Sequence, residues 1–399
     1  MSAPSSRAFA PRLLGATLAE RHPGIAASAG VFAAALLAFL AIGAALPVLP
    51  GYVRGPLRSG DVAVGIVVGA FALTAVVCRP LAGRQADVRG RRAVLIAGAL
   101  AMSVGGVLYL ISTSVATLIV ARLVVGGGEG AVYTAGATWA VDLAPEDRRG
   151  LALGLFGLAV WGGLSLGPLA GELLRSSVSY DAVWAATVVL PLAGALLALR
   201  LPEPRGAAQI EGEPGPLAFF PRAAHRPGLA LALANIGYAA LAGFVILHLR
   251  ARGIGGGASV FTAFAVAVFA SRIALSQVPD RAGARRTATI AGAVEALGLT
   301  IIALAQSLAV ALAGAVVVGI GFSMLFPSLA LMVVGRVGDD RRGSALGAFT
   351  AFFDIGVGLG GPLAGVTAAL AGYPAVFVVG AVAAACTAVL AAAPSTRRG

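Results

Sequence analysis

The chain contains twelve apolar runs, and each is long enough to cross a lipid bilayer as a helix. One span takes about 20 residues, so twelve spans use roughly 240 of the 399 residues. Only 12% of the residues are charged, against about 25% in an ordinary soluble domain, and the mean hydropathy is +0.93. No water-soluble fold can bury that much apolar surface. The sequence therefore predicts an all-α integral membrane protein. The predicted spans are 27–50, 62–83, 93–112, 115–139, 149–173, 183–201, 228–249, 258–278, 287–305, 308–333, 343–367 and 375–393.

Arginine predicts the topology, because all 29 basic residues are Arg and the net charge is +12. With the N-terminus in the cytoplasm, and with Arg122 inside the fourth span set aside, the outer connections carry only 5 Arg and the inner face carries 23. Short cytoplasmic loops attract such an excess of positive charge. We therefore expect both termini in the cytoplasm, a bacterial inner membrane, and a first run that is retained as a span. The same placement of Arg in short loops argues against nucleic-acid binding.

Two cysteines and the absence of lysine exclude several classes of protein. Cys78 and Cys386 lie inside apolar runs of different halves, which rules out a disulfide framework and a zinc site. A P-loop needs a lysine to hold nucleotide phosphates, so ATP hydrolysis by this chain is excluded. We expect no enzyme activity, no metal and no cofactor, with a proton gradient as the energy source.

The two halves of the sequence repeat each other. Three matches carry the repeat: residues 87–92 with 280–286, Arg79 with Arg272, and residues 167–171 with 361–365. The first two matches are 193 residues apart and the third is 194 apart. An offset containing an even number of spans gives both halves the same orientation, related by an axis along the membrane normal. A substrate path between the halves follows from that arrangement.

Five segments are expected from this repeat. The connection between the halves contains six prolines, which exclude a continuous helix across it. The segments are a cytoplasmic N-terminal segment (1–26), an N-terminal six-helix half (27–201), a cytoplasmic linker (202–227), a C-terminal six-helix half (228–393) and a cytoplasmic tail (394–399).

Three motifs resemble the major facilitator superfamily, specifically its twelve-span drug:proton antiporters. The loop after the second span, residues 83–92, is similar to G-x-x-x-D-R-x-G-R-R, with Val88 where Arg is usual and Arg89 beside it. The fourth span is similar to R-x-x-Q-G-x-G, with Val125 in place of Gln. The fifth span matches G-x-x-x-G-P-x-x-G, which the resemblance associates with antiporters. The motif residues are Gly83, Asp87, Arg89, Gly90, Arg91 and Arg92, their repeat Asp280, Arg281 and Gly283, and the antiporter set Gly163, Gly167, Pro168 and Gly171.

The physical chemistry of two motifs suggests roles at the boundary between the halves. Asp87 could accept hydrogen bonds from a helix N-terminus or a loop Arg, and so latch the halves at the cytoplasmic side. The alternative is that this Arg run only sets topology. The glycines of the fifth span form a small-residue face, and Pro168 removes one backbone hydrogen bond, so we expect a kinked, tightly packed helix at that boundary. Generic packing without bearing on transport direction is the alternative.

Charges inside spans are functional candidates, because a charge near the bilayer centre is costly unless it is paired or hydrated. Arg122 and Glu129 lie about 10 and 20 Å deep on one face of the fourth span at 1.5 Å per residue. Burial disfavours an ionised carboxylate and a nearby cation favours it, so Glu129 could exchange a proton for substrate. A structural partner of a neighbouring helix is the alternative. The resemblance assigns the position of Arg122 to proton coupling.

The second half carries different charges. Asp354 lies near the middle of the eleventh span and is a candidate for proton coupling or substrate contact, although its repeat counterpart is Trp161. Ala315 stands at the position matching Arg122, so coupling is expected mainly in the N-terminal half. Glu295 is expected to be structural. His248, near a span end, is expected to be interfacial.

The resemblance implies that the first, fourth, seventh and tenth spans line the cavity. These spans contribute Phe39, Tyr133, Asn235, Tyr238, Phe322 and Phe326. Aromatic walls with few fixed polar groups suit bulky apolar or cationic ligands, although aromatic residues inside spans more often serve packing.

Together these features predict a monomeric secondary transporter that exports hydrophobic or cationic small molecules against proton entry by alternating access. The first alternative is a major facilitator transporter of a sugar or other metabolite, either an exporter or an importer; a cavity rich in Asn, Gln and hydroxyl groups would favour it. The second is a membrane receptor or enzyme, which no nucleophile–base set or extramembrane domain supports. A proton-flux assay would distinguish a receptor or enzyme from both kinds of transporter.

Overall fold

A computed structural model describes residues 23–145, 148–203, 222–337 and 342–393, and these residues form helices and connections without any strand. Twelve helices in these ranges are long and apolar enough to cross a membrane. The first half contains α2 (Pro23–Ala45), α3 (Leu49–Arg54), α4 (Asp61–Arg89), α5 (Arg91–Leu110), α6 (Val115–Asp142), α7 (Arg149–Ser177) and α8 (Tyr180–Leu199). The second half contains α9 (Arg222–Ala251), α10 (Gly257–Ala274), α11 (Val278–Ala282), α12 (Ala284–Leu304), α13 (Leu308–Val334), α14 (Arg342–Ala371) and α15 (Tyr373–Ala392).

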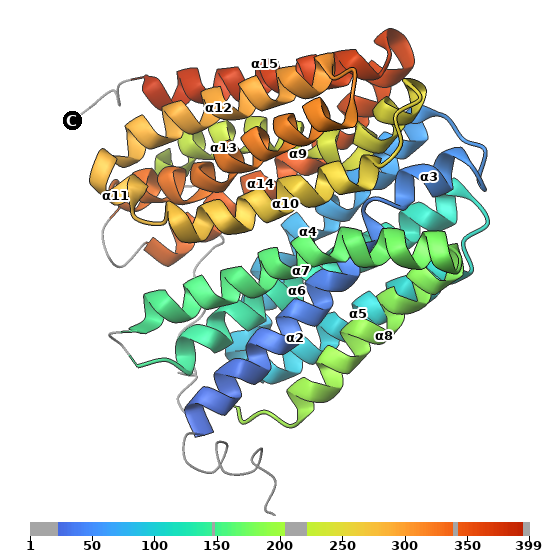
Figure 1. Cartoon of the computed structure of the whole chain (residues 1–399). Helices are drawn as coiled ribbons and strands as arrows, with labels where there is room; N and C mark the ends of the chain where they lie inside the picture. Colours follow the sequence, from blue (N-terminus) through green and yellow to red (C-terminus); the bar gives the residue numbers. More distant parts are fainter. Residues whose placement is uncertain (1–22, 146–147, 204–221, 338–341, 394–399) are drawn as a thin grey trace, which may run out of the picture.

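The twelve long helices form two bundles, and each bundle packs mainly within its own half (Figure 1). Within the first bundle α6 contacts α4 and α5, and α2 contacts α7 and α8. Corresponding contacts, α13 with α10 and α12, and α9 with α14 and α15, build the second bundle. The halves meet along α4 against α14 and α7 against α10. The predicted all-α fold of twelve spanning helices is therefore confirmed.

The contact between α4 and α14 depends on glycine. A Cβ atom on Gly65 would lie 2.3 Å from the carbonyl oxygen of Gly361, and a Cβ on Gly361 would lie 2.5 Å from that of Gly65. Any larger side chain would therefore force these backbones apart. Figure 1 shows the halves packed together at the end where α3 lies and spread apart toward the opposite end.

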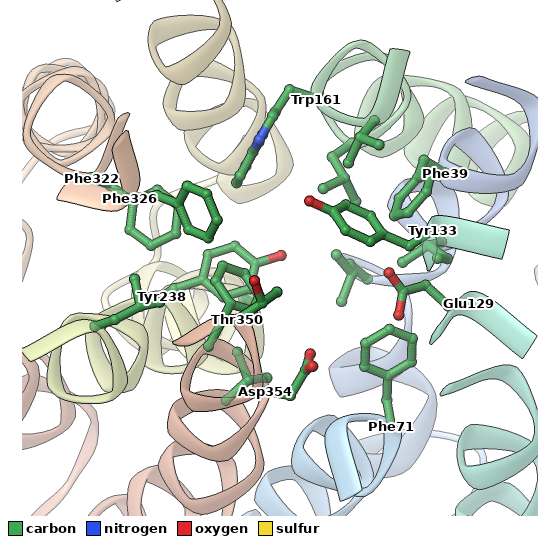
Figure 2. Close-up of a pocket in the computed structure, with 18 of the residues that line it drawn as sticks. Phe39, Phe71, Glu129, Tyr133, Trp161, Tyr238, Phe322, Phe326, Thr350 and Asp354 are labelled. Atoms are coloured by element: carbon green, nitrogen blue, oxygen red, sulfur yellow. The ribbon is translucent and has the colours of Figure 1, made fainter. Parts of the chain in front are cut away.

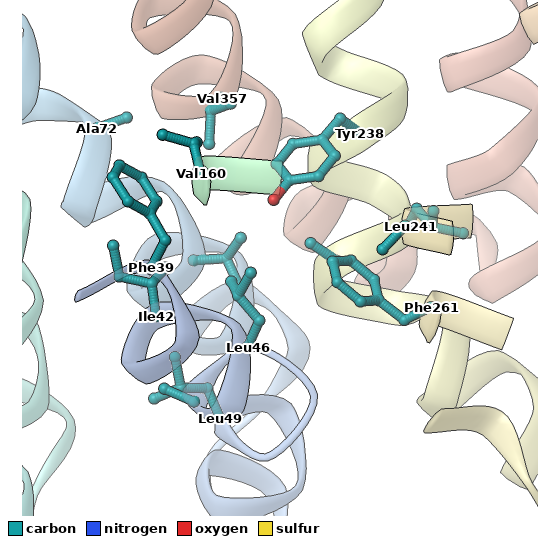
Figure 3. Close-up of a cluster of buried hydrophobic side chains, with 14 of the residues drawn as sticks. Phe39, Ile42, Leu46, Leu49, Ala72, Val160, Tyr238, Leu241, Phe261 and Val357 are labelled. Carbon is teal, nitrogen blue, oxygen red and sulfur yellow. The ribbon is translucent and has the colours of Figure 1, made fainter. Parts of the chain in front are cut away.

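A single apolar cluster crosses from one half to the other. Figure 3 shows Phe39 and Leu46 from the start of the first half facing Tyr238 and Phe261 of the second. All four side chains are buried in one cluster that draws on most of the long helices. Because the apolar contacts continue between the bundles, the boundary between them is held by packing as well as by charge.

The loop expected after the second span proved to be mostly helical. Helix α4 continues to Arg89, so only Gly90 separates it from α5. Gly90 has φ +91°, and Gly283 at the equivalent point of the second half has φ +87°. Positive φ is open to glycine at no steric cost, which explains why glycine ends this helix in both repeats.

Helix α9 begins at Arg222, inside the range predicted for the linker, and runs through Pro227. At the end of the first predicted span, the helix stops at Ala45 and resumes as the short α3. Most of the predicted N-terminal segment and linker, and the whole tail, lie outside the described residues.

Candidate functional site

A cavity of about 120 Å³ lies between the two halves and is lined by four helices from each. These are α2, α4, α6 and α7 from the first half, and α9, α10, α13 and α14 from the second. One buried water needs about 10–15 Å³ on the same measure, so this cavity has room for a small organic molecule or several waters. Most of its lining is aromatic or aliphatic, and Figure 2 shows Glu129 and Asp354 among the side chains around it.

Arg79 on α4 forms an ion cluster with two carboxylates in the cavity. Its Nε donates to Asp354 Oδ2 at 2.7 Å, and its Nη2 donates to Glu129 Oε2 at 3.1 Å. Arg79 also lies 4.6 Å above the ring of Tyr133. Both carboxylates are almost fully buried, with 1% of the Asp354 side chain and 4% of the Glu129 side chain exposed. Because Asp354 belongs to α14 and Arg79 to α4, this ion cluster joins the two halves.

Arg122 lines the same cavity without contacting a carboxylate. Its Nε and Nη2 donate to the carbonyl oxygens of Val67 and Val68 at 3.0 and 3.1 Å. Its Nη1 lies 3.5 Å from the hydroxyl of Tyr109, and its guanidinium lies 4.8 Å from the centre of the Phe71 ring. The backbone of α4 therefore provides most of the acceptors for this buried cation.

A third cation, Arg272 on α10, reaches the cavity from the second half. Its guanidinium lies 5.1 Å from the centre of the Trp161 ring, and its Nη2 is 3.5 Å from the carbonyl oxygen of Ser323. Arg79 and Arg272 were missed as candidates by the sequence analysis, which used them only to define the repeat. Each lies inside a predicted span, so the rule on membrane-embedded charges already applied to both.

The residues expected to line the cavity were aromatic side chains and one amide, Asn235. The aromatic side chains are found there. Phe39, Tyr133, Tyr238, Phe322 and Phe326 all line it. Figure 2 shows the hydroxyl groups of Tyr133 and Tyr238 directed toward its interior.

Asn235 is not part of the lining, which corrects the prediction for that residue. It is fully buried, donates to the carbonyl oxygen of Leu231 at 2.8 Å and packs beside Gly356 of α14. Tyr238, three residues further along α9, reaches the cavity, whereas Asn235 packs against α14.

The expected latch between halves is absent from the described contacts of Asp87. Asp87 pairs with Arg91 at 3.0 Å, and Arg91 pairs with Asp142 at 2.9 Å, all within the first half. Glu203, not Asp87, accepts hydrogen bonds from the backbone at the start of α5. In the second half, Asp280 and Arg281 are exposed. In this conformation the halves are spread apart at the end carrying the motif, so its contacts remain local.

Helix α7 lies at the boundary between the halves as expected, where it contacts α10, but its glycine face packs against α2 of its own half. Cβ atoms on Gly163 and Gly167 would lie 2.6 Å from the amide nitrogen of Leu40 and 2.5 Å from the Cα of Gly43, both on α2. A Cβ on Gly171 would similarly meet the backbone of α2. The opposite half is reached instead by Ser165, whose hydroxyl donates to the carbonyl oxygen of Ala265 on α10 at 2.8 Å.

Two further titratable groups lie away from the cavity. Glu295 on α12 is fully buried, and neither of its oxygens has a hydrogen-bond partner among the described residues. His248 is also buried, and its Nε2 lies 3.0 Å from the carbonyl oxygen of Ile302. It is therefore packed inside the second half. Within the described ranges, no three His, Cys, Asp or Glu side chains converge as a metal site would require.

These features define a class of protein. Two similar bundles of spanning helices enclose one shared cavity, and buried charges from both bundles meet inside it. This is the architecture of a membrane transporter whose site lies between two repeats.

Comparison with known proteins identifies the family. The model of the Major Facilitator Superfamily matches residues 31–278 and 253–398, so the chain belongs to this superfamily of transporters and is not an enzyme. An uncharacterized MFS-type transporter of Salmonella typhimurium is 34% identical over 88% of this chain and 92% of its own length. A second, from Burkholderia mallei, is 32% identical over 88% of this chain and 87% of its own length.

Solved structures share the fold. The nucleoside transporter NupG is 16% identical with a TM-score of 0.77, covering 91% of this chain and 98% of that one. The human organic anion transporter TETRAN is 20% identical with a TM-score of 0.70, covering 92% of this chain and 99% of that one. At these identities the likeness extends to the fold alone.

Proposed function

We propose that this chain is a proton-coupled secondary transporter that exports hydrophobic small molecules by alternating access. The observation that carries the proposal is the ion cluster in the cavity, where Arg79 of the first half holds Glu129 of its own half and Asp354 of the other. A cluster of this kind links the charge state of the cavity to the relative position of the two halves.

The proton acts through the bond between Arg79 and Asp354. When Asp354 is ionised, its contact with Arg79 at 2.7 Å ties α14 to α4. A proton on Asp354 removes the negative charge and weakens this tie, while Glu129 can still hold Arg79 on the side of the first half. Protonation therefore favours separation of the halves at the cavity, which is the movement that alternating access requires.

The lining supports hydrophobic substrates. Among the residues that the structure describes, the hydroxyl groups of the lining come only from Thr350 and the two tyrosines, and neither Asn nor Gln contributes to it. A sugar site would need more fixed polar groups to match the hydroxyls of its ligand. A cationic substrate, also expected from the sequence, would have to displace Arg79 before it could reach either carboxylate.

Export is the direction expected from the resemblance of α7 to antiporters. With the termini cytoplasmic, as the arginine distribution predicts, the separated end in Figure 1 would face the cytoplasm. Such a conformation could take up substrate from inside the cell. Transport of a sugar or other metabolite, inward or outward, is the runner-up.

The experiment uses purified protein in liposomes with an acidic lumen and the membrane potential clamped by potassium and valinomycin. Three probes whose charge does not change with pH, tetraphenylphosphonium, chloramphenicol and 1-naphthalenesulfonate, are added outside. The wild type should accumulate at least one of them in the lumen as protons leave. Asp354→Asn should reduce this gradient-driven accumulation at least tenfold, because the proton site is lost, while still exchanging probe across the membrane.

The matched control is Glu172→Gln, because among the described residues Glu172 pairs with Arg175 of the same helix and does not line the cavity. It should accumulate the probe like the wild type, and Glu129→Gln should resemble Asp354→Asn. Unchanged accumulation in both cavity variants would refute the proton assignment. Gradient-driven uptake of a sugar, with none of the three probes transported, would favour the runner-up.

A further inference from the structure

The repeat places a second arginine opposite the Arg79 cluster, in a different environment. Arg272 is the counterpart of Arg79, and both line the cavity. The counterparts of Glu129 and Asp354 are Phe322 and Trp161, at the same offset of 193 residues. The second site therefore keeps the cation of the first but has aromatic rings where the first has carboxylates.

Arg272 pairs with no carboxylate in the described part of the chain, and its hydrogen bond to the Ser323 carbonyl is long at 3.5 Å. Among the same residues, its Nε is buried without a hydrogen-bond partner, and so is Nη1 of Arg79 on the other wall. A buried donor without an acceptor is unfavourable, and a guanidinium cannot lose its charge to relieve the cost.

The charged side chains that line the cavity also have a positive net charge. Three guanidinium groups line it, those of Arg79, Arg122 and Arg272, against the carboxylates of Glu129 and Asp354. With all five groups ionised, one positive charge remains uncompensated. Arg122 is already held by two backbone carbonyls, so the unsatisfied cation is Arg272.

We propose that Arg272 forms a subsite for the acidic group of the substrate, which is a hydrophobic organic acid carrying a single carboxylate. The apolar body of the acid would pack against Trp161 and Phe322, whose ring centroids lie 5.7 Å apart. Figure 2 shows these two rings on adjoining walls, away from the Glu129 carboxylate. The inference rests on the proposed function in that the same cavity binds the substrate. The proton would then bind beside Arg79 and the substrate beside Arg272, which hold equivalent positions in the two repeats.

The test measures binding to the purified full-length protein in detergent by titration calorimetry. Three probes share one ring system and differ in charge: 1-naphthylacetate, 1-naphthylacetamide and 1-naphthylethylammonium. We expect wild type to bind the acetate about tenfold or more tightly than the amide or the ammonium, because only the acetate offers a charge-assisted, two-pronged contact to Arg272.

Variants assign the preference to this residue. Arg272→Gln should reduce the preference for acetate over amide to less than about threefold, with the affinity for the amide unchanged within about twofold. Arg272→Lys should retain part of it, since Lys keeps the charge but lacks the planar fork. Arg250→Gln, which removes an exposed arginine of the same half outside the cavity, should behave like wild type.

A second variant leaves Arg272 in place. Phe322→Glu restores the carboxylate that the Arg79 site has at the equivalent position, and it should abolish the preference for acetate by pairing with Arg272. The proposal is overturned if Arg272→Gln or Phe322→Glu keeps the preference, or if wild type binds the acetate no better than the other probes. Binding needs no gradient, so loss of proton-driven accumulation with an intact acetate preference would refute the proposed coupling and leave this subsite standing.

Discussion

Arg79 and Arg272 hold equivalent positions in the two repeats, yet of the two only Arg79 forms an ion pair with a residue that the structure describes. Arg79 contacts Asp354 at 2.7 Å, whereas Arg272 lies over the Trp161 ring. In each case the partner comes from the opposite half, on α14 for the first site and on α7 for the second. A single position facing across the boundary therefore decides whether a buried cation ties the halves together or remains available to a ligand.

The glycine faces of α7 and α14 differ in a similar way. Gly167 packs on Gly43 of its own half, while its counterpart Gly361 packs on Gly65 of the other half. The same motif stabilises a bundle in one repeat and joins two bundles in the other. In both contrasts the contact that joins the halves lies between α4 and α14: Arg79 with Asp354 in the first, and Gly65 with Gly361 in the second.

The largest effect is expected from removing Arg79. Arg79→Gln leaves two buried carboxylates without their cation, and breaking such a pair costs about 3–5 kcal/mol. Arg272→Gln removes no ion pair, so its thermal unfolding midpoint in detergent should stay much closer to that of wild type. Thermal unfolding of the three purified proteins, followed by circular dichroism, measures the difference. Equal destabilisation by both substitutions would show that the two sites are energetically alike, contrary to the structure.

A medium effect is expected at the glycine contact between halves. A Cβ on Gly361 would lie 2.5 Å from the Gly65 carbonyl oxygen, and overpacking of this kind costs about 1–3 kcal/mol. Gly361→Ala should therefore favour conformations in which the halves are further apart at the α3 end. Gly347→Ala is the matched control on the same helix, since nothing lies within 4 Å of its Cβ.

The separation can be measured by electron-electron double resonance between spin labels at Arg58→Cys and Gly255→Cys, after both native cysteines are replaced by serine. The distance distribution should shift to longer values in Gly361→Ala and remain unchanged in Gly347→Ala. Gly167→Ala should lower stability without moving the distance, because its contact lies within one half. A similar shift with Gly167→Ala would remove the distinction between the two glycine faces.

The sequence predicted what depends on hydropathy and composition. Twelve spans and two repeated halves follow from apolar runs and from recurring residues, and Glu129, Arg122 and Asp354 lie in the cavity because charges inside spans avoid lipid. Arg79 could have been found by the same rule. Its match to Arg272 identifies the repeat but does not by itself indicate a function.

The remaining differences concern direction and conformation, which a linear pattern does not contain. Asn235 and Tyr238 belong to one helix, but only Tyr238 reaches the cavity. The partner of Asp87 depends on which end of the molecule is closed. The neighbour of Gly167 depends on the rotation of α7 about its axis. Such choices are decided by tertiary packing, since periodicity identifies a small-residue face without identifying what covers it.

The smallest effect is expected at Glu295, where the repeats differ again. Its counterpart, 193 residues earlier, is Met102, which is also buried. Burying a polar group without a hydrogen bond costs about 1–3 kcal/mol in proteins, and both oxygens of Glu295 are without partners among the described residues. Glu295→Met should therefore raise the thermal unfolding midpoint, whereas Glu295→Gln, which keeps a polar group there, should change it less. If Glu295→Met instead abolished proton-driven accumulation while the protein stayed folded, the second repeat would contain a proton site of its own, and the division of roles between the repeats would be wrong.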